Sequence, residues 1–361
     1  MQIRVIADDF ASATDALPAF AQRGWSTRVV LRSAPASTPG TSEVWSTDTD
    51  SRTLPDEAAA VLAASWAGQW READILVKQF DSTVRGPVGA EVLAAWQASG
   101  RSKLIVAPAF PAAGRTTDRG HVLVDGVPVH QTSFASDPLN PVRVSSLPAL
   151  FGTHGLTLPC ARDAAEAMAQ LAMHTAVVVD ATTEADLQAL VRHAGDRRDV
   201  LWAGSTGLLR VLAATLQTQA EPRPAWQAAQ RPGLVVGSQN PRSREQHRQA
   251  QTRAKGAILW ATPEEPGDPD RLTAQLVDEV CEAVMAGRCD GLVVTGGETA
   301  KHIARRLQAQ EIRVLQEVQP GIPLCLMRTP RGVIPLVTKA GGFGDDDVFM
   351  QCLQALTGVH A

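Results

Sequence analysis

The chain alternates short apolar runs with helical patterns from its first residues, and this alternation constrains the fold more than any other feature. Residues 3–6 predict a buried strand, and a helical pattern follows from residue 12 to about residue 23. Similar strand and helix pairs recur along the 361 residues, a length that suits about two domains. The pattern predicts an α/β fold of doubly wound sheets, with helices on both faces of each sheet.

A proline-rich stretch interrupts the alternation in the second half. Residues 219–232 contain Pro222, Pro224 and Pro232 among polar residues without a clear period, which is typical of a linker. We therefore expect a first domain over residues 1–218, a linker over 219–232 and a second domain over 233–361.

Composition and charge exclude several classes of protein. The formal net charge of −4 gives no basic excess for binding nucleic acid, and no apolar run approaches the roughly 18 residues that cross a membrane. The five cysteines form no C-x-x-C pair, which predicts thiols in a reducing compartment. The first residues lack a signal-peptide layout. We expect a cytoplasmic protein with neither a nucleic-acid nor a membrane partner, and the sequence leaves a homodimer open.

Asp8 and Asp9 directly follow the first predicted strand. Parallel α/β sheets bind their ligands at the carboxyl ends of the strands, beside helix N-termini. Two adjacent carboxylates are costly to hold together unless they bind a hydroxylated ligand, a cation or a proton. The alternative is an N-cap aspartate beside a solvated one, and the stretch by itself does not decide between the two.

A second polar cluster follows the strand predicted at residues 74–78. Basic side chains bind carboxylates and phosphates, and hydroxyl or carboxylate side chains bind sugar hydroxyls, so the cluster suits a small polyhydroxy acid. The alternative is a surface loop with a local Asp–Arg pair. Arg115 lies in another basic, hydroxylated loop, residues 114–117. The members of the first cluster are Lys78, Asp81, Ser82, Thr83 and Arg85.

Three glycine loops in the second half each follow a predicted strand and open a predicted helix. They comprise residues 237–238, 295–299 and 341–344. Glycine lets the backbone approach a ligand, and a helix N-terminus offers N–H donors to phosphate. A single loop of this kind often carries glycine for steric reasons alone, whereas three such loops in one domain favour a nucleotide or phosphorylated ligand. Lys339, before the last loop, either meets a phosphate or is a solvated surface lysine.

Other motifs narrow the choice. The chain has no G-x-x-x-x-G-K-[ST], and no G-x-G-x-x-G follows its first strand, which argues against a P-loop and an ordinary dinucleotide site. Residues 121–130 predict a hairpin around Asp125-Gly126. Its register would place His121 opposite His130, a pair that suits a surface contact better than a metal site because no third ligand is evident.

Six segments, in order, resemble one family: the four-carbon acid sugar kinases, which were first described as a domain of unknown function. The segments span nearly the whole chain, and their shared order is more specific than any one of them. They are I-A-D-D-F-A-S-A-T-D (6–15), K-Q-F-D-S-T-V-R-G (78–86), A-P-A-F-P-A-A-G-R-T-T (107–117), V-V-G-S (235–238) with S-R-E-Q (243–246), T-G-G-E-T (295–299) and K-A-G-G-F-G (339–344).

The resemblance implies an N-terminal domain that binds a sugar acid, a C-terminal domain that binds ATP, and a ligand cleft between them. The implied reaction transfers the γ-phosphoryl group of ATP to the terminal hydroxyl of threonate, erythronate or an oxo-tetronate. By matched position, the sugar-acid side comprises Asp8, Asp9, Asp81, Ser82 and Arg85. The ATP side comprises Ser238, Gly296, Gly297, Glu298, Thr299, Gly341 and Gly342.

The chain departs from the family pattern in the substrate half. Ala11 and Ser12 replace threonine and glycine, Gln79 replaces a second lysine, and Pro87 replaces an asparagine. These changes bear on the identity of the sugar acid more than on the use of ATP.

Phosphoryl transfer depends on positioning and charge stabilisation. We expect Arg85, with Lys78, to anchor the substrate carboxylate. Asp9 or Asp8 would accept the hydroxyl proton, and only one of them, because neighbours on a strand point opposite ways. Mg²⁺ is expected to bridge the phosphates, with ligands that the sequence does not name.

Two rival functions belong to other classes. Asp8, Asp9 and residues 344–347 suggest an aspartate-dependent phosphohydrolase, but that chemistry requires a D-x-D spacing and these aspartates are adjacent. A non-catalytic sugar-acid-binding protein would bind its ligand without turnover. Phosphate release from a sugar phosphate without ATP would identify the first rival.

Overall fold

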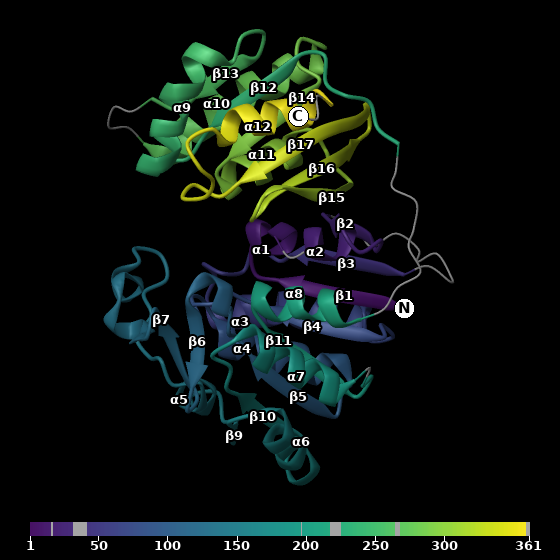
Figure 1. Ribbon diagram of the computed structural model, residues 1–361, viewed down its shortest axis with the longest axis vertical. Coiled ribbons are helices and arrows are strands. Elements are labelled where there is room, and N and C mark those ends of the chain that lie inside the picture. Colours follow the sequence, from purple (N-terminus) through teal and green to yellow (C-terminus); the bar gives the residue numbers. More distant parts are fainter. Residues whose placement is uncertain (16, 32–41, 196, 217–224, 264–267, 359–361) are drawn as a thin grey trace. The chain divides into compact units, whose positions relative to one another are not determined.

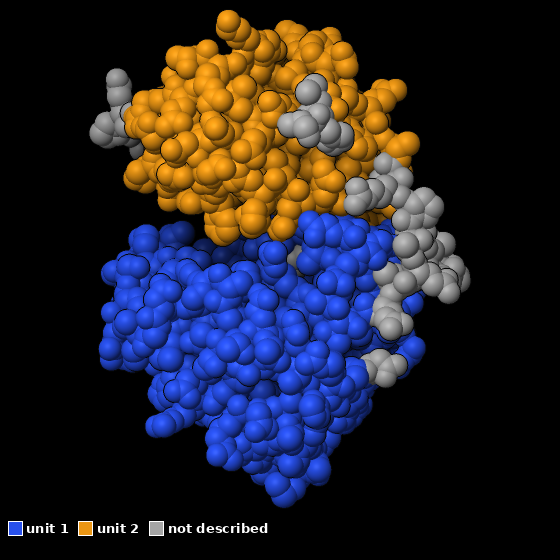
Figure 2. All heavy atoms as spheres, in the orientation of Figure 1, with its two compact units in different colours: residues 1–26, 38–221 blue, residues 27–37, 222–361 orange. Residues whose placement is uncertain are grey.

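The computed structural model describes residues 1–15, 17–31, 42–195, 197–216, 225–263 and 268–358. The chain forms two compact units, which Figure 2 colours separately. Unit 1 comprises residues 1–26 and 38–221, and unit 2 comprises residues 27–37 and 222–361. Residues 27–37, which the predicted boundary at 218 assigned to the first domain, thus group with unit 2. Residues 219–224 of the predicted linker lie outside the described part of the chain.

The main sheet of unit 1 is parallel throughout, in the strand order β3-β1-β4-β11-β5-β10-β9 (Figure 1). Its central strands are continuous apolar runs, such as Leu104-Ile105-Val106 with no exposed surface, because helices cover both faces of a parallel sheet. The strands are β1 (Gln2–Ala7), β3 (Glu43–Asp48), β4 (Ile75–Gln79), β5 (Lys103–Ala107), β9 (Cys160–Ala161), β10 (Ala176–Val179) and β11 (Val200–Gly204).

The helices of unit 1 follow the strands in alternation, as predicted. Helices α3 and α4 pack on each other, and α6, α7 and α8 pack in sequence. The helices are α1 (Phe10–Asp15), α2 (Leu17–Ala21), α3 (Asp56–Gln69), α4 (Val88–Ser99), α5 (Leu147–Gly152), α6 (Ala164–Met173), α7 (Glu184–Ala194) and α8 (Thr206–Thr215).

A small antiparallel sheet of β6 (Arg115–Asp118), β7 (His121–Val124) and β8 (Val127–Pro128) confirms the predicted hairpin. Val124 pairs with Val127, and Asp125 and Gly126 both take positive φ angles, 49° and 80°, as a type I′ turn requires. His121 and His130 each form a hydrogen bond with the Ser145 hydroxyl, at 3.2 and 3.0 Å. The two rings therefore share a serine in this structure.

The sheet of unit 2 is half parallel and half antiparallel, in the order β13-β12-β14-β17-β16-β15-β2. The first four strands are parallel, and the remainder pair antiparallel. Strands β15, β16 and β17 form an antiparallel meander of long strands. The strands are β2 (Ser26–Val30), β12 (Pro232–Val236), β13 (Ile258–Ala261), β14 (Gly291–Thr295), β15 (Glu311–Gln319), β16 (Ile322–Thr329) and β17 (Gly332–Lys339).

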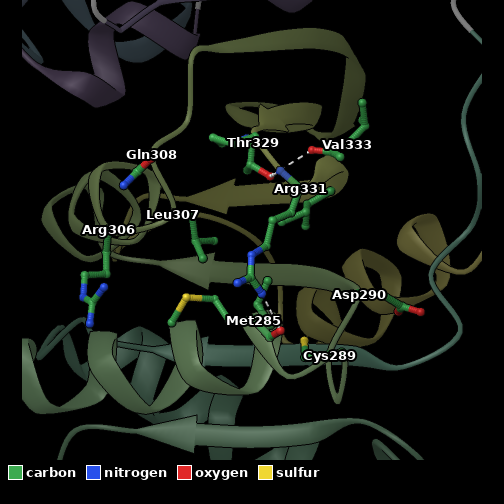
Figure 3. A pocket seen from close by; sticks show the side chains of 14 residues that line it. Met285, Cys289, Asp290, Arg306, Leu307, Gln308, Thr329, Arg331 and Val333 are labelled. Carbon is green, nitrogen blue, oxygen red and sulfur yellow. Dashed lines mark hydrogen bonds between the residues drawn. The ribbon is translucent and has the colours of Figure 1, made fainter.

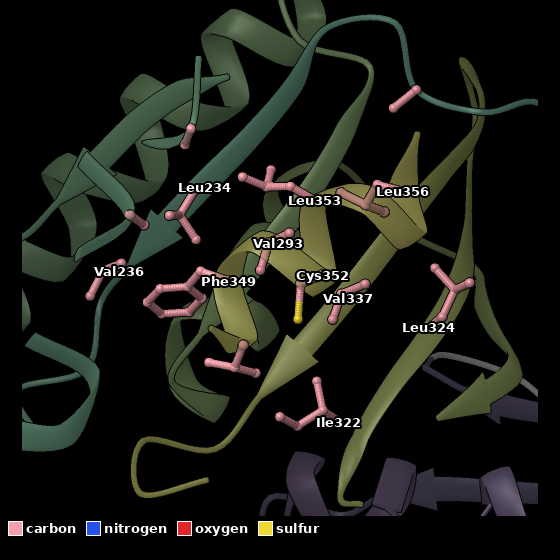
Figure 4. Close-up of a cluster of buried hydrophobic side chains, with 14 of the residues drawn as sticks. Leu234, Val236, Val293, Ile322, Leu324, Val337, Phe349, Cys352, Leu353 and Leu356 are labelled. Atoms are coloured by element: carbon pink, nitrogen blue, oxygen red, sulfur yellow. The ribbon is translucent and has the colours of Figure 1, made fainter. Parts of the chain in front are cut away.

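The core of unit 2 lies between its sheet and the C-terminal helix. Figure 4 shows Phe349 of this helix on the side of Leu234 and Val236, and Cys352 beside Val337. The buried helix face recurs every three or four residues, as an amphipathic helix requires. The helices of unit 2 are α9 (Pro241–Arg253), α10 (Pro269–Met285), α11 (Gly297–Arg306) and α12 (Val348–Leu356).

Among the described residues, no helix is both long and apolar enough to span a bilayer.

Candidate functional site

Asp8 and Asp9 meet a single guanidinium at the carboxyl end of β1. Arg52 binds both oxygens of Asp8, through Nε at 2.8 Å and Nη2 at 2.9 Å, and its Nη1 pairs with Asp9. Nη2 also donates to the Ser12 hydroxyl at 2.8 Å. We call Asp8, Asp9, Ser12 and Arg52 the carboxylate–arginine cluster. The two aspartates do not point opposite ways, as strand alternation predicted, because β1 ends at Ala7.

The local backbone fixes Arg52 in this position. Strand β3 runs parallel to β1 and ends at Asp48, opposite Ala7. The chain then turns through Asp50, which has a positive φ of 52°, and the amides of Ser51 and Arg52 donate to the carbonyl of Asp8 at 3.0 and 3.2 Å. The sequence analysis did not single out Arg52, which lies beyond the end of β3. The polar run D-T-D-S-R after that strand was the available signal.

Opposite charges and burial determine the electrostatics of the cluster. Burial raises the pKa of Asp9, with a smaller contribution from Asp8 in the same direction, while Arg52 lowers it. Burial alone would lower the pKa of Arg52, but Asp8 and Asp9 raise it well above its usual range. Arg52 therefore remains a cation whose side chain is 15% exposed.

Lys78 lies beneath this cluster and pairs with a second residue that the sequence did not single out. Its ammonium lies 3.2 Å from the Glu91 carboxylate, and neither side chain has exposed surface. Burial raises the pKa of Glu91, while the charge of Lys78 lowers it. The Ser51 hydroxyl donates to the other oxygen of Glu91, so the pair supports the turn that leads to Arg52.

The loop after β4 contains the predicted Asp–Arg pair. Arg85 donates to Asp81 at 2.8 and 3.2 Å and to Asp137 at 3.1 Å, and its guanidinium lies over the Phe134 ring. Burial would raise the pKa of Asp81, but the Arg85 hydrogen bonds and the charges of Arg52 and Arg85 lower it to about 2. Ser82, half-buried, lies in the same turn.

Backbone strain accompanies this pair. Val84 takes a φ of 56°, a left-handed conformation that a β-branched residue avoids at a cost of about 1–3 kcal/mol. Its amide donates to the Asp81 carbonyl at 2.8 Å. Such strain persists only where the surrounding structure holds it, and it is commonly found at ligand-binding sites.

Asp15, at the end of α1, is the third aspartate of this region. The Thr206 hydroxyl donates to its Oδ2 at 3.4 Å, and Gln79 Nε2 donates to the Thr206 hydroxyl at 3.1 Å. Its Oδ1 is buried and has no hydrogen-bond partner among the described residues. Burial, with the charge of Asp9, raises the pKa of Asp15 to about 7, although Arg52 and the Thr206 hydrogen bond lower it.

Arg115 lies on the small antiparallel sheet, where its guanidinium donates to the carbonyl of Ala113. No hydrogen bond or ion pair within the described ranges joins it to Arg52 or to Arg85. Its predicted contact with the substrate stays a prediction.

The three glycine loops of unit 2 meet at one edge of its sheet. Strands β12, β14 and β17 are neighbours, with Val236 opposite Thr295 and Thr295 opposite Lys339, so their carboxyl ends are aligned. The amides of Gly237 and Gly296 donate to the carbonyls of Thr295 and Lys339. We call this region the glycine edge, comprising Gly237, Ser238, Gly296, Gly297, Glu298, Thr299, Gly341 and Gly342.

Close contacts at the glycine edge require residues without a Cβ. A Cβ on Gly237 would overlap the Thr299 hydroxyl, and a Cβ on Gly341 would overlap the Ser238 hydroxyl and lie 2.9 Å from Asn240. Gly296 has a φ of 104°, which favours glycine. Helix α11 begins at Gly297, so its free N–H groups lie where phosphate is commonly bound.

Lys339 is buried beneath the last glycine loop. Its ammonium donates to the Ser243 hydroxyl and to the carbonyls of Ala340, Gly341 and Phe343, at 3.0 to 3.1 Å. Burial lowers its pKa to about 8. These four contacts hold the loop, so a direct contact of Lys339 with phosphate would require some of them to break.

Two cavities lie outside the carboxylate–arginine cluster and the glycine edge. One, of about 510 Å³, is lined in part by Thr53, Val84 and Arg143, beside the loop that contains Asp81 and Arg85. The other, of about 490 Å³, lies near the starts of β14 and β17, at the opposite end of the sheet from the glycine edge. Figure 3 shows Arg331 reaching across it to the Met285 carbonyl, at 2.8 Å.

No group of three or more His, Cys, Asp or Glu side chains that could hold a metal ion occurs in the part of the chain that the structure describes. Glu298, at the start of α11, is the acidic member of the glycine edge. Its carboxylate is 69% exposed and pairs with Lys301.

Comparisons with known proteins match the chain to two domain families. A sugar-binding N-terminal domain family matches residues 3–212, and a nucleotide-binding C-terminal domain family matches residues 159–349. The D-threonate kinase of Bordetella bronchiseptica is 33% identical, over 98% of this chain and 97% of its own. The D-threonate kinase of Salmonella typhimurium is 31% identical, over 98% of each chain.

More distant relatives, 25 to 26% identical, are named D-erythronate kinase and 3-oxo-tetronate kinase. A crystal structure from Bordetella bronchiseptica, described as a domain of unknown function with bound citrate in a domain-swapped dimer, is 31% identical with a TM-score of 0.53. The match covers 98% of this chain and 98% of the chain in that crystal structure. The chain belongs to the four-carbon acid sugar kinase family.

Proposed function

We propose that this protein transfers the γ-phosphoryl group of ATP to the terminal hydroxyl of a four-carbon sugar acid, with D-threonate as the first acid to test. The observation that carries the proposal is the carboxylate–arginine cluster, which combines a fixed cation with hydroxyl-binding carboxylates at the carboxyl end of β1. A sugar acid presents the matching chemistry, one carboxylate and several hydroxyls. The names of the relatives at 31 to 33% identity support D-threonate.

The contacts in unit 1 suggest a separate role for each of its charged side chains. Arg85, with a side chain that is 26% exposed, is the residue that we assign to the substrate carboxylate, because a guanidinium binds a carboxylate through two N–H groups. Asp81 and Asp137 hold it for that contact. Lys78, which was expected to assist Arg85, has no exposed surface, so we assign it to supporting the Arg52 turn through Glu91.

ATP is assigned to the glycine edge, because backbone N–H groups and a helix N-terminus suit phosphate. Ser243 and Gln246 of α9 support this edge by donating to carbonyls of the last glycine loop at 2.6 to 3.2 Å. Mg²⁺ accompanies ATP in this proposal and neutralises phosphate charge. It would be held mainly by phosphate and water oxygens, with Glu298 as the carboxylate at hand. The ligand cleft between the domains stays a prediction.

The phosphohydrolase alternative finds less support in the contacts of the aspartates. Both oxygens of Asp8 accept hydrogen bonds from Arg52, which weakens Asp8 as a nucleophile. Asp346 and Asp347 pair with Arg242 and Arg253. A homodimer remains part of the proposal, supported by the domain-swapped dimer of the solved relative, and light scattering of the purified protein would test it.

The experiment that tests the function is ADP production with Mg-ATP and a panel of acids. The panel contains D- and L-threonate, D- and L-erythronate and the 2- and 3-oxo-tetronates, each with and without ATP. We expect turnover with D-threonate that requires ATP. Turnover with none of the acids, together with no ATP binding by calorimetry, would contradict the kinase assignment, and phosphate release from a sugar phosphate without ATP would favour the hydrolase.

A further inference from the structure

The hydrogen bonds around Asp8, Asp9 and Asp15 distinguish Asp15 from the other two. Asp8 accepts from Arg52 through both of its oxygens. Asp9 accepts a hydrogen bond from the Ser12 amide through Oδ1, at 2.7 Å, and its Oδ2 forms an ion pair with Arg52. Three of these four oxygens accept hydrogen bonds and the fourth is paired with a guanidinium, so both carboxylates are poorly suited to take a proton from a substrate.

Asp15 has one oxygen that is occupied and one that is not. Gln79 Nε2 can only donate, so the Thr206 hydroxyl accepts from it and must direct its single proton to Asp15 Oδ2. Oδ1 is left without a partner among the described residues, although it is shielded from water. Leaving a buried acceptor unpaired is unfavourable, and a proton arriving on that oxygen would relieve this cost.

We propose that Asp15 Oδ1, rather than Asp8 or Asp9, accepts the proton that leaves the substrate hydroxyl during phosphoryl transfer. This role rests on the proposed function. The hydroxyl oxygen forms a bond to the γ-phosphorus of ATP, the bond from that phosphorus to the bridging oxygen breaks and ADP leaves, and the hydroxyl proton moves to Oδ1. Asp15 then returns the proton to solvent before the next turnover.

The charges around Asp15 fit this role. The charged groups that act on it are Asp9, which raises its pKa, and Arg52, which lowers it, while burial accounts for the largest part of the shift to about 7. A general base works best with a pKa near the working pH. Arg52 and the Thr206 hydrogen bond both lower the pKa of Asp15 and so favour its ionised form.

The first test compares Asp15→Asn with wild type on the best acid of the panel. We expect kcat to fall roughly 100-fold or more, as loss of a general base does, with little change in either KM. The acidic limb of the kcat profile, near pH 7 in wild type, should disappear. Asp118→Asn, an exposed aspartate on β6, serves as the control and should keep the wild-type profile.

Thr206→Val provides an isosteric second variant that keeps the carboxylate. Removing the hydroxyl should raise the pKa of Asp15 and move the acidic limb to higher pH while leaving kcat at high pH close to wild type. An unmoved limb, or Asp15→Asn with kcat within threefold of wild type, would overturn the assignment while leaving the kinase function intact. A wild type that is silent with every acid and binds no ATP would overturn both.

Thermal unfolding gives a readout that needs no substrate. Because the pKa of Asp15 is about 7 in the folded protein against an ordinary value of 3.8, protonated Asp15 favours the folded state at low pH. That advantage is lost as the pH rises through about 7. The Tm of Asp15→Asn relative to wild type should therefore increase between pH 5 and pH 8, and a constant difference would overturn the proposal.

Discussion

The carboxylate–arginine cluster and the glycine edge both lie at the carboxyl ends of parallel strands. Side chains form the cluster, whereas the backbone forms most of the glycine edge. In the first, charged side chains bind each other, with Arg52 between Asp8 and Asp9. In the second, the backbone is brought close to neighbouring hydroxyls, as at Gly237 beside Thr299. The first constellation therefore depends on charge and the second on the absence of side-chain atoms.

This difference predicts opposite sensitivities to substitution. Loss of a charge or of a hydrogen-bond donor in the cluster leaves a buried partner unpaired, which is expensive even where the shape is kept. At the glycine edge a single added methyl group is enough to displace the backbone, whereas surface charge matters less.

The largest effect is expected for Arg52→Lys. A lysine cannot bind both oxygens of Asp8 and also reach Asp9 and Ser12, so it leaves buried acceptors unpaired. We expect the free energy of unfolding to fall by about 3 kcal/mol or more and kcat/KM for the sugar acid to fall roughly 100-fold or more. Urea unfolding and steady-state kinetics measure the two quantities.

The control for Arg52→Lys is the affinity for ATP in the folded variant. Since Arg52 belongs to unit 1 and the glycine edge to unit 2, the Kd for ATP measured by calorimetry should stay within twofold of wild type. If the Arg52→Lys variant kept wild-type activity on the sugar acid, Arg52 would not be part of the binding site.

Gly341→Ala should produce the complementary result. The added Cβ meets the Ser238 hydroxyl and Asn240, and overpacking of this kind costs about 1–3 kcal/mol. Because each 1.4 kcal/mol corresponds to a factor of ten, the Kd for ATP should rise roughly tenfold, with little change in sugar-acid binding. Gly152→Ala, where the Cβ would meet open space, is the matched control, and equal effects of the two changes would refute the steric argument.

The smallest effect is expected for Asp81→Asn, and it depends on pH. The pKa of Asp81 is about 2 in the folded protein against an ordinary value of 3.8, so its ionised form stabilises the fold by about 2 kcal/mol above pH 4. That contribution is lost as the pH falls from about 4 to about 2. Urea unfolding should show a larger deficit for Asp81→Asn at pH 7 than at pH 2.5, and a deficit independent of pH would contradict this origin.

Local pattern was sufficient to predict the parts of the molecule that depend on neighbours in sequence. The strand that precedes Asp8 and Asp9 and the hairpin that pairs Val124 with Val127 follow from periodicity and turn residues. The glycine loops were each found from their composition. Their alignment at one edge required only the rule that neighbouring parallel strands present their carboxyl ends together.

The missed features depend on contacts between distant residues. Arg52 meets Asp8 only because β3 lies beside β1 and extends to Asp48, and a strand end is the least certain part of a sequence-based assignment. The burial of Lys78 and Lys339 could not be predicted from local sequence pattern either. A lysine is usually exposed. Lys78 pairs with Glu91 and Lys339 donates to Ser243, and both of these partners come from other elements.

The grouping of residues 27–37 with unit 2 has a consequence for how the protein is made. The Thr27 hydroxyl donates to the carbonyl of Val314, 287 residues further along the chain, and β2 pairs with β15. During synthesis the segment of β2 emerges long before its partner strand exists, and such distant pairings form slowly. A C-terminal fragment beginning at residue 222 would carry β15 without β2, and its unpaired strand would be exposed to aggregation.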